Sequence, residues 1–252
     1  MLSVSPVDRR TLRLPWSALL ANKAHEFWTK ATGRRIKGQG MIGASHAAVR
    51  EGFGSLVGED FHEYNLPQAW VERRQIPQVL HGRVPTTNAR IVDLGCGPGT
   101  STDVLCHFAD PSWQIFGYDL TPHLIDAARQ RAAKGEFKNR EGVAIHPEFH
   151  CQSIAEPLNL PDESIDLAIS GGVVGLYLQQ SEAQALLQEL KRIIKPNGFI
   201  ALDAGPAIPV ELLTQLATAA GFTYVAKAKS FIIEPRPKLV FQKPARRSTL
   251  PT

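Results

Sequence analysis

The residues with the clearest chemical meaning lie in a glycine-rich turn. Gly95, Gly97 and Gly99 alternate with other residues, and Asp93 stands two places before the first glycine. The turn follows an apolar, strand-like segment at 89–92 and leads into a polar segment that can open a helix. Glycine permits a positive-φ turn and lets a ligand approach the backbone closely, while N–H groups at a helix start face a polar or anionic group. This order of elements predicts a cradle for a nucleotide cofactor.

The spacing of the glycines distinguishes between cofactors. The dinucleotide fingerprint G-x-G-x-x-G would place its third glycine at position 100, which is Thr100. The observed D-x-G-x-G-x-G pattern resembles motif I of the class I S-adenosylmethionine (SAM)-dependent methyltransferases. A generic tight turn has a similar composition, so the resemblance depends on the motifs that follow.

A second strand-like segment, 114–120, carries Asp119 twenty residues after Gly99. A carboxylate at this point can accept hydrogen bonds from both ribose hydroxyls. NAD-binding folds share this acid, so Asp119 supports nucleoside binding without selecting the nucleoside; the alternative is that it only caps the next turn. Thr121 as N-cap and Pro122 at the first helical position predict a helix after the strand.

Two later regions also resemble the family. In the segment 152–170, Ser153 stands where many members carry an Asp that contacts adenine, and its hydroxyl is a weaker partner for the adenine amino group. The segment 187–200 resembles a helix, a Pro-Gly-Gly-type turn and a fifth strand, with Asn197 replacing a glycine. Asn tolerates the left-handed conformation. With four motifs in order between 92 and 200, the chain is identified as a member of this family.

The resemblance implies a set of cofactor-binding residues. They are Asp93, Gly95, Cys96, Gly97, Gly99, Asp119, Leu120, Ser153, Ile154 and Ser170. In this set the glycines approach the methionine and ribose portions, Asp93 orients the turn and reaches the methionine ammonium, and Cys96 is a small filler. Leu120 and Ile154 sandwich the adenine, and the turn that follows Ser170 lies where methyl and acceptor meet.

The implied chemistry is an in-line displacement that needs no metal. The protein holds the acceptor and the methyl group at roughly 3–3.5 Å, and a base is needed only if the acceptor arrives protonated. His46, Tyr64 and Tyr177 are weak candidates for that base, and the favoured alternative for each is an ordinary packing or surface residue. Ser-Gly-Gly-Val at 170–173 argues against methylation of the adenine amine or of glutamine, which typically uses Asn/Asp-Pro-Pro-aromatic there.

Strands and helices alternate between 89 and 203, which predicts an α/β fold with a parallel sheet and helices on both faces. The resemblance implies a Rossmann-like, seven-stranded sheet whose last strand is antiparallel. The strands are expected at 89–94, 114–119, 147–152, 165–170, 198–203, 222–233 and 238–242. Helices are expected from a capping box that starts at Ser181 to about residue 194, and at 209–220.

Three parts are expected along the chain. Residues 1–85 form an N-terminal helical cap or lid on the acceptor side, 86–243 form the SAM-binding domain, and 244–252 form a disordered tail. In the first part, 19–30 and 44–49 can be helical, and the glycine-dense stretch 33–58 predicts mobile loops. A loose N-terminal extension is the alternative to a lid.

Composition bounds the setting and the partners. The chain has 252 residues, 43% of them hydrophobic, and no apolar run approaches the about 20 residues of a membrane span. Its three cysteines form no metal-ligand spacing and no even disulfide set, which favours a reducing cytoplasm. The net charge of +4 is scattered in small clusters, unlike a nucleic-acid track.

An apolar segment at 173–177 can form a pocket wall, and it favours a small, fairly apolar acceptor methylated at O, N or C. The alternative is a methyltransferase or SAM-binding protein that acts on RNA or protein through a basic N-terminal surface. The oligomeric state, monomer or homodimer, is left open.

Overall fold

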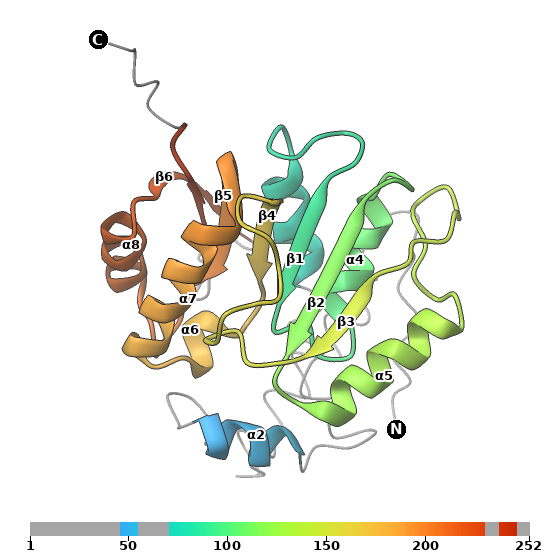
Figure 1. Cartoon of the computed structure of the whole chain (residues 1–252), viewed down its shortest axis with the longest axis horizontal. Helices are drawn as coiled ribbons and strands as arrows, with labels where there is room; N and C mark the ends of the chain where they lie inside the picture. Colours follow the sequence, from blue (N-terminus) through green and yellow to red (C-terminus); the bar gives the residue numbers. More distant parts are fainter. Residues whose placement is uncertain (1–45, 55–70, 230–236, 246–252) are drawn as a thin grey trace, which may run out of the picture.

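A seven-stranded sheet forms the centre of the molecule (Figure 1). The computed structural model describes residues 46–54, 71–229 and 237–245. The strands are β1 (Arg90–Leu94), β2 (Gln114–Asp119), β3 (Glu148–Cys151), β4 (Ile165–Ser170), β5 (Ile194–Asp203), β6 (Thr223–Ala228) and β7 (Lys238–Gln242), in the spatial order β3-β2-β1-β4-β5-β7-β6. β1 to β5 are parallel, and β7 is antiparallel to both β5 and β6. The predicted fold class is confirmed.

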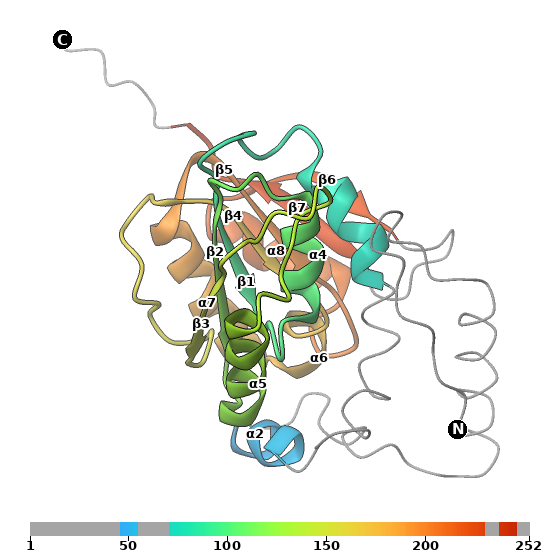
Figure 2. The same cartoon turned by 90° about the vertical axis from the view of Figure 1, so that its right-hand side faces the viewer.

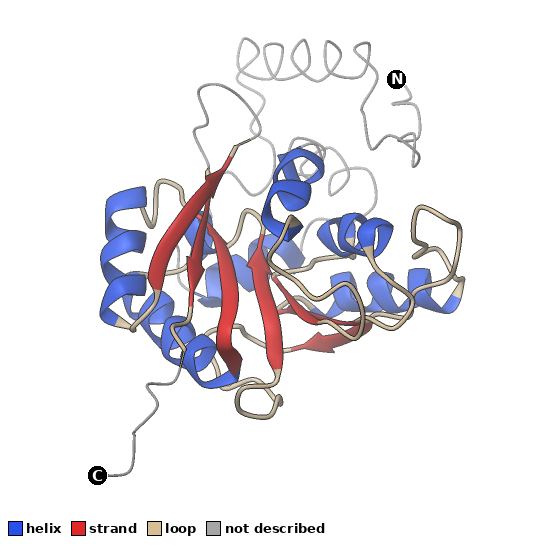
Figure 3. Cartoon of the chain, turned by 90° about the horizontal axis from the view of Figure 1, so that it is seen from above, coloured by secondary structure: helices blue, strands red, loops and turns tan. Residues whose placement is uncertain are grey.

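Helices cover both faces of the sheet (Figure 3). The described helices are α2 (His46–Gly54), a helical segment at 71–80, α4 (Thr100–Phe108), α5 (Pro122–Ala133), α6 (Val174–Tyr177), α7 (Gln180–Ile193) and α8 (Val210–Ala219). Successive side chains of a strand point to opposite faces. Val92 and Leu94 therefore join the core beneath α7 and α8, while Ile91 joins the core beneath the 71–80 helix, α4 and α5.

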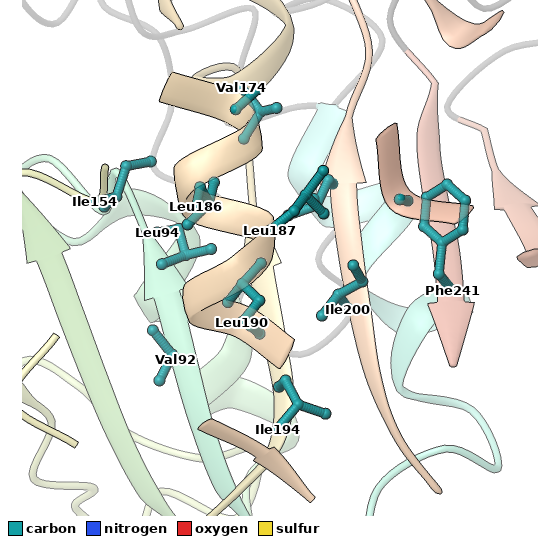
Figure 4. Close-up of a cluster of buried hydrophobic side chains, with 14 of the residues drawn as sticks. Val92, Leu94, Ile154, Val174, Leu186, Leu187, Leu190, Ile194, Ile200 and Phe241 are labelled. Carbon is teal, nitrogen blue, oxygen red and sulfur yellow. The ribbon is translucent and has the colours of Figure 1, made fainter. Parts of the chain in front are cut away.

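α7 shows how the sequence builds one of these layers. Its buried residues recur at helical spacing and form one apolar stripe: Ala183, Leu186, Leu187, Leu190 and Ile193. Figure 4 shows three of these leucines against Leu94 and Ile200. Burying such side chains stabilises the fold by roughly 1.5–3 kcal/mol each.

The predicted start of α7 was wrong. The capping box is formed by Gln179 and Glu182 rather than from Ser181, and the Gln179 backbone N–H donates to Glu182 Oε2 at 2.7 Å. A box starting at Ser181 would have Gln184 at its fourth position. Glu182 offers a charged acceptor, which makes the stronger hydrogen bond.

β5 begins earlier than expected, at Ile194, directly after α7. The predicted turn is contained within this strand, where the pairing register with β4 shifts. Asn197 has φ 65°, so the left-handed conformation predicted for it is confirmed. β6 ends at Ala228, whereas the strand was expected to run to residue 233. Residues 230–233 of that expected strand lie outside the described part. Of the expected tail, 246–252 also lies outside it.

The N-terminal part contains two helices in its described residues. α2 overlaps the helix expected at 44–49 and extends beyond it, so Gly52 and Gly54 lie in a helix and not in the mobile loops expected for 33–58. The helix expected at 19–30 lies outside the described residues. The helix at 71–80 was not predicted; its inward side chains, among them Ile76 and Val79, pack on the sheet.

α2 lies beyond the edge of the sheet at which the parallel strands end, close to α6 and α5 (Figures 1 and 2). The rings of Phe53 in α2 and Tyr177 in α6 meet edge to face, with centroids 5.2 Å apart. None of the helices in the described ranges is long and apolar enough to span a bilayer.

Candidate functional site

The carboxyl ends of the parallel strands gather the candidate residues at one edge of the sheet. From β1 the chain continues to β2 and β3 on one side, and it later crosses to β4 and β5 on the other. β1 and β4 are therefore neighbours at the point where the strand order reverses. In open α/β sheets, ligands bind in the crevice at such a switch point.

The glycine-rich turn follows β1 and opens α4. Gly95, Gly97 and Gly99 all have positive φ, at 73°, 52° and 85°. The N–H groups of Gly95 and Cys96 donate to the carbonyl of Tyr118, at 2.7 and 3.1 Å, which ties the turn to β2. α4 begins after Gly99 without a side-chain cap, so a helix N-terminus, the kind of place that receives an anion or a hydroxyl, follows directly on the glycine turn.

Gly95 and Gly99 are also required by close packing. A Cβ on Gly95 would overlap the side chain of Val173, which follows β4, and a Cβ on Gly99 would overlap Phe137. Cys96 is buried, and burial raises the pKa of its thiol well above the ordinary value. A buried thiol whose ionisation is disfavoured is unreactive, which is compatible with the filler role expected for Cys96.

Asp119 joins the turn to the next helix. Its Oδ2 accepts a hydrogen bond from the Gly97 N–H at 3.0 Å, and its Oδ1 accepts one from the Thr121 N–H at 2.8 Å. Burial raises the pKa of Asp119, and these two N–H donors oppose that rise. The side chain remains half-buried, so a carboxylate stands at the end of β2 beside the glycine turn.

Asp93 is fully buried at the end of β1. Its Oδ2 accepts hydrogen bonds from Ser101 Oγ at 2.7 Å and from Thr102 Oγ1 at 2.6 Å, which fixes the start of α4. Its Oδ1 is buried without a hydrogen-bond partner in the described part of the chain. Burial raises the pKa of Asp93 to about 6, against the lowering effect of the two hydroxyls.

The end of β4 is held by a second buried carboxylate. Ser170 Oγ donates to Asp203 of β5, and the same carboxylate accepts from the Gly175 N–H at 3.0 Å. Ser170 and Asp203 are both buried. The hydroxyl of Ser170 thus fixes the turn after β4, and the sequence reasoning did not identify Asp203.

Glu72 and Lys238 were also missed. Lys238 Nζ lies 2.8 Å from Glu72 Oε2, and the side chains are 0% and 1% exposed. Lys238 begins β7, and Glu72 lies in the unpredicted helix at 71–80. Neither stands near a motif, so only the inward periodicity of residues 71–80 could have indicated Glu72.

The residues expected around adenine follow β2 and β3. Leu120 is half-buried after β2, and Ser153 is buried, with its Oγ accepting the Ala155 N–H at 3.2 Å. Ile154 packs in the core beside Leu94 (Figure 4). Leu120 and Ser153 follow the neighbouring strands β2 and β3. The side chain of Ile154 packs in the hydrophobic core.

The candidate bases are less well placed. Tyr177 is buried against Phe53. His46 begins α2, but its side chain lies outside the described residues, as does all of Tyr64. Within the described ranges, no three His, Cys, Asp or Glu side chains are grouped as ligands for a metal ion.

Comparison with known proteins agrees with this fold. Residues 91–198 match the family model described as a methyltransferase domain. An arsenite methyltransferase of Halobacterium salinarum is 30% identical over 113 residues, which cover 45% of this chain and 26% of that protein. A trans-aconitate 2-methyltransferase of Methylobacterium radiotolerans is 25% identical over 169 residues, which cover 62% of this chain and 64% of that protein.

A solved structure shares the fold. It is described as a putative SAM-dependent methyltransferase from Methanococcus maripaludis, with a TM-score of 0.57 at 15% identity, and the match covers 80% of this chain and 94% of that one. The fold and the glycine-turn site define a class I SAM-dependent methyltransferase domain. Residues 91–198, which match the family model, make up most of this domain, and the rest of the chain lies outside the match. The chain spans less than two thirds of the length of the relatives it matches.

Proposed function

We propose that the protein transfers the methyl group of SAM to a small, fairly apolar acceptor at oxygen, nitrogen or carbon. The observation that carries this proposal is the hydrogen bond from the Gly97 N–H to Asp119 Oδ2, made at the switch point of the sheet. This hydrogen bond links the glycine turn, whose backbone a ligand can approach closely, to the Asp119 carboxylate, which can accept hydrogen bonds from a ribose diol.

The residues present fit the cofactor. Asp119 would hold the ribose, and the glycine turn would receive the methionine portion. The Oδ1 of Asp93, buried and without a hydrogen-bond partner in the described ranges, would face the ammonium. Leu120 and Ser153 would border the adenine. SAM carries its methyl group on a sulfonium, which makes that carbon electrophilic without a metal. The task of the chain is then to exclude water and to align the acceptor.

The acceptor side is the region of Gly171, Gly172 and the α6 helix. Burial of Val174, Leu176 and Tyr177 makes this side apolar. Two relatives are named for small acceptors, arsenite and trans-aconitate, which supports a small acceptor here as well. The contact between Phe53 and Tyr177 supports a role of the N-terminal part as a cap over this side.

Calorimetry with SAM and with S-adenosylhomocysteine tests the proposal. We expect both to bind without added metal. Absence of heat with both, together with binding of a pyridine dinucleotide, would overturn it. Steep salt dependence of binding to tRNA or rRNA would favour an RNA acceptor instead.

The cap and the cellular setting are tested separately. S-adenosylhomocysteine should protect residues 46–54 from limited proteolysis if they belong to a lid, and an unchanged digestion pattern would mark them as a loose extension. All three cysteines are free. This fits a reducing cytoplasm, and localisation of a tagged chain would test that setting.

A further inference from the structure

A charged pair is fully buried at the same edge of the sheet as the glycine turn. Lys238 Nζ and Glu72 Oε2 are 2.8 Å apart, and neither side chain is exposed by more than 1%. Removing two charges from water costs more than their attraction commonly returns. A buried ion pair is therefore weak evidence for a stabilising role. The groups that surround the pair indicate a different role.

The pair lies against the turn that follows β4. Lys238 Nζ also donates to the carbonyl of Ser170 at 2.5 Å. A Cβ on Gly171 would overlap the carboxylate of Glu72, so that carboxylate lies directly against the turn. Ser170 pairs with Leu94 of β1. Glu72 and Lys238 are thus brought to the carboxyl ends of β1 and β4, where the glycine turn begins.

Asp93 provides the second observation. Its Oδ1 is buried without a hydrogen-bond partner among the described residues, and its ionisation is disfavoured by Glu72 and favoured by Lys238. Asp93, Glu72 and Asp203 are buried carboxylates, and Lys238 is the buried cation that accompanies them. When ionised, these four groups carry a net charge of −2, which would complement a cationic ligand group.

We propose that Glu72 and Lys238 position the amino-acid end of the cofactor. Glu72 and Asp93 together would face the α-ammonium group, and Lys238 would hold both Glu72 and the Ser170 carbonyl in place. This inference rests on the proposed function, because it concerns the same cofactor. Both residues lie outside the matched domain at 91–198, so the family motif does not include them.

Two ligands separate this role from a general effect on the fold. S-adenosylhomocysteine carries the amino-acid end, whereas 5′-methylthioadenosine keeps the adenosine and the sulfur but lacks that end. By calorimetry, Glu72→Gln should weaken S-adenosylhomocysteine binding by roughly ten- to a hundredfold, the scale of one lost charged hydrogen bond. Binding of 5′-methylthioadenosine should change less than about twofold, since its contacts are elsewhere.

Asp166→Asn is the matched control. Asp166 is also buried and paired with a lysine, Lys195, at 2.8 Å, but it lies at the opposite end of β4. This variant should bind both ligands like the wild type. Glu72→Gln leaves Lys238 without its anion, so the double variant Glu72→Gln/Lys238→Met removes both charges. We expect the double variant to regain thermal stability and to keep the selective loss of S-adenosylhomocysteine binding.

The outcomes are distinct. Equal weakening of both ligands by Glu72→Gln, or unchanged binding of both in a folded variant, would overturn the positioning role. Full recovery of S-adenosylhomocysteine binding in the double variant would also overturn it. If the wild type binds neither ligand, the proposed function itself fails.

Discussion

Replacing Asp119 by Ala tests the centre of the proposed site. The change removes the acceptor of two backbone N–H groups, those of Gly97 at 3.0 Å and Thr121 at 2.8 Å. It also removes the proposed acceptor for the ribose diol. A hydrogen bond to a charged group contributes about 1.5–3 kcal/mol. Water reaches the half-buried site in the variant and offsets part of this loss.

We therefore expect Asp119→Ala to weaken binding of S-adenosylhomocysteine by about 1–3 kcal/mol, or roughly five- to a hundred-and-fifty-fold. Calorimetry measures the affinity, and circular dichroism establishes that the variant is folded. Both S-adenosylhomocysteine and 5′-methylthioadenosine should lose affinity, because both carry the ribose.

Asp110→Ala is the matched control for this prediction. Asp110 also accepts two hydrogen bonds, both from Ser112, but it lies in the turn that precedes β2, at the opposite end of the strand from Asp119. Its replacement should leave both affinities unchanged. Wild-type affinity in folded Asp119→Ala would remove Asp119 from the site and refute the reasoning.

Three further changes have defined outcomes. Burial raises the pKa of Asp93 to about 6, and the ligand ammonium favours the ionised carboxylate. The affinity for S-adenosylhomocysteine should therefore fall as pH is lowered from 7 to 5, by at most about tenfold per pH unit. A calorimetric affinity that does not change with pH would contradict this. Gly95→Ala should lower the melting temperature and abolish cofactor binding, because its Cβ would overlap Val173 at a positive φ; a wild-type melting curve would count against the close packing. Phe53→Ala should lower the free energy of unfolding by about 0.5–1.5 kcal/mol, because the ring contact with Tyr177 is lost. It should also speed proteolysis of α2. Unchanged cleavage would show that this contact does not hold the helix.

The fold was predictable where local signals and burial agree. The alternation of strands and helices, Pro122 at the start of α5 and the left-handed Asn197 follow from residue types that favour those conformations. Element limits were less predictable, as at the start of α7, because Gln179 caps the helix only through its partner Glu182. The 71–80 helix was missed because Pro77 lies within it and its apolar residues are few, at Val71, Ile76, Val79 and Leu80.

The candidate site divides in the same way. Asp93 and Asp119 stand in a local motif, so their place at the strand ends was predictable from sequence. Glu72 and Lys238 are 166 positions apart in the chain, and no local pattern links them. Their meeting depends on the helix at 71–80 and on the antiparallel insertion of β7, which are consequences of tertiary packing.

That insertion also affects how the sheet is assembled during synthesis. β6 is made before β7, yet β6 pairs only with β7 in the described sheet, and β7 in turn pairs with β5. A nascent chain that has not yet released residues 238–242 from the ribosome therefore holds β6 as an unattached ribbon, with Tyr224 and Phe241 not yet in contact. Of the described strands, the last to be made is an interior one, so translation arrest or a frameshift just before it would leave β6 and one edge of β5 unpaired and exposed to aggregation and to quality-control proteases.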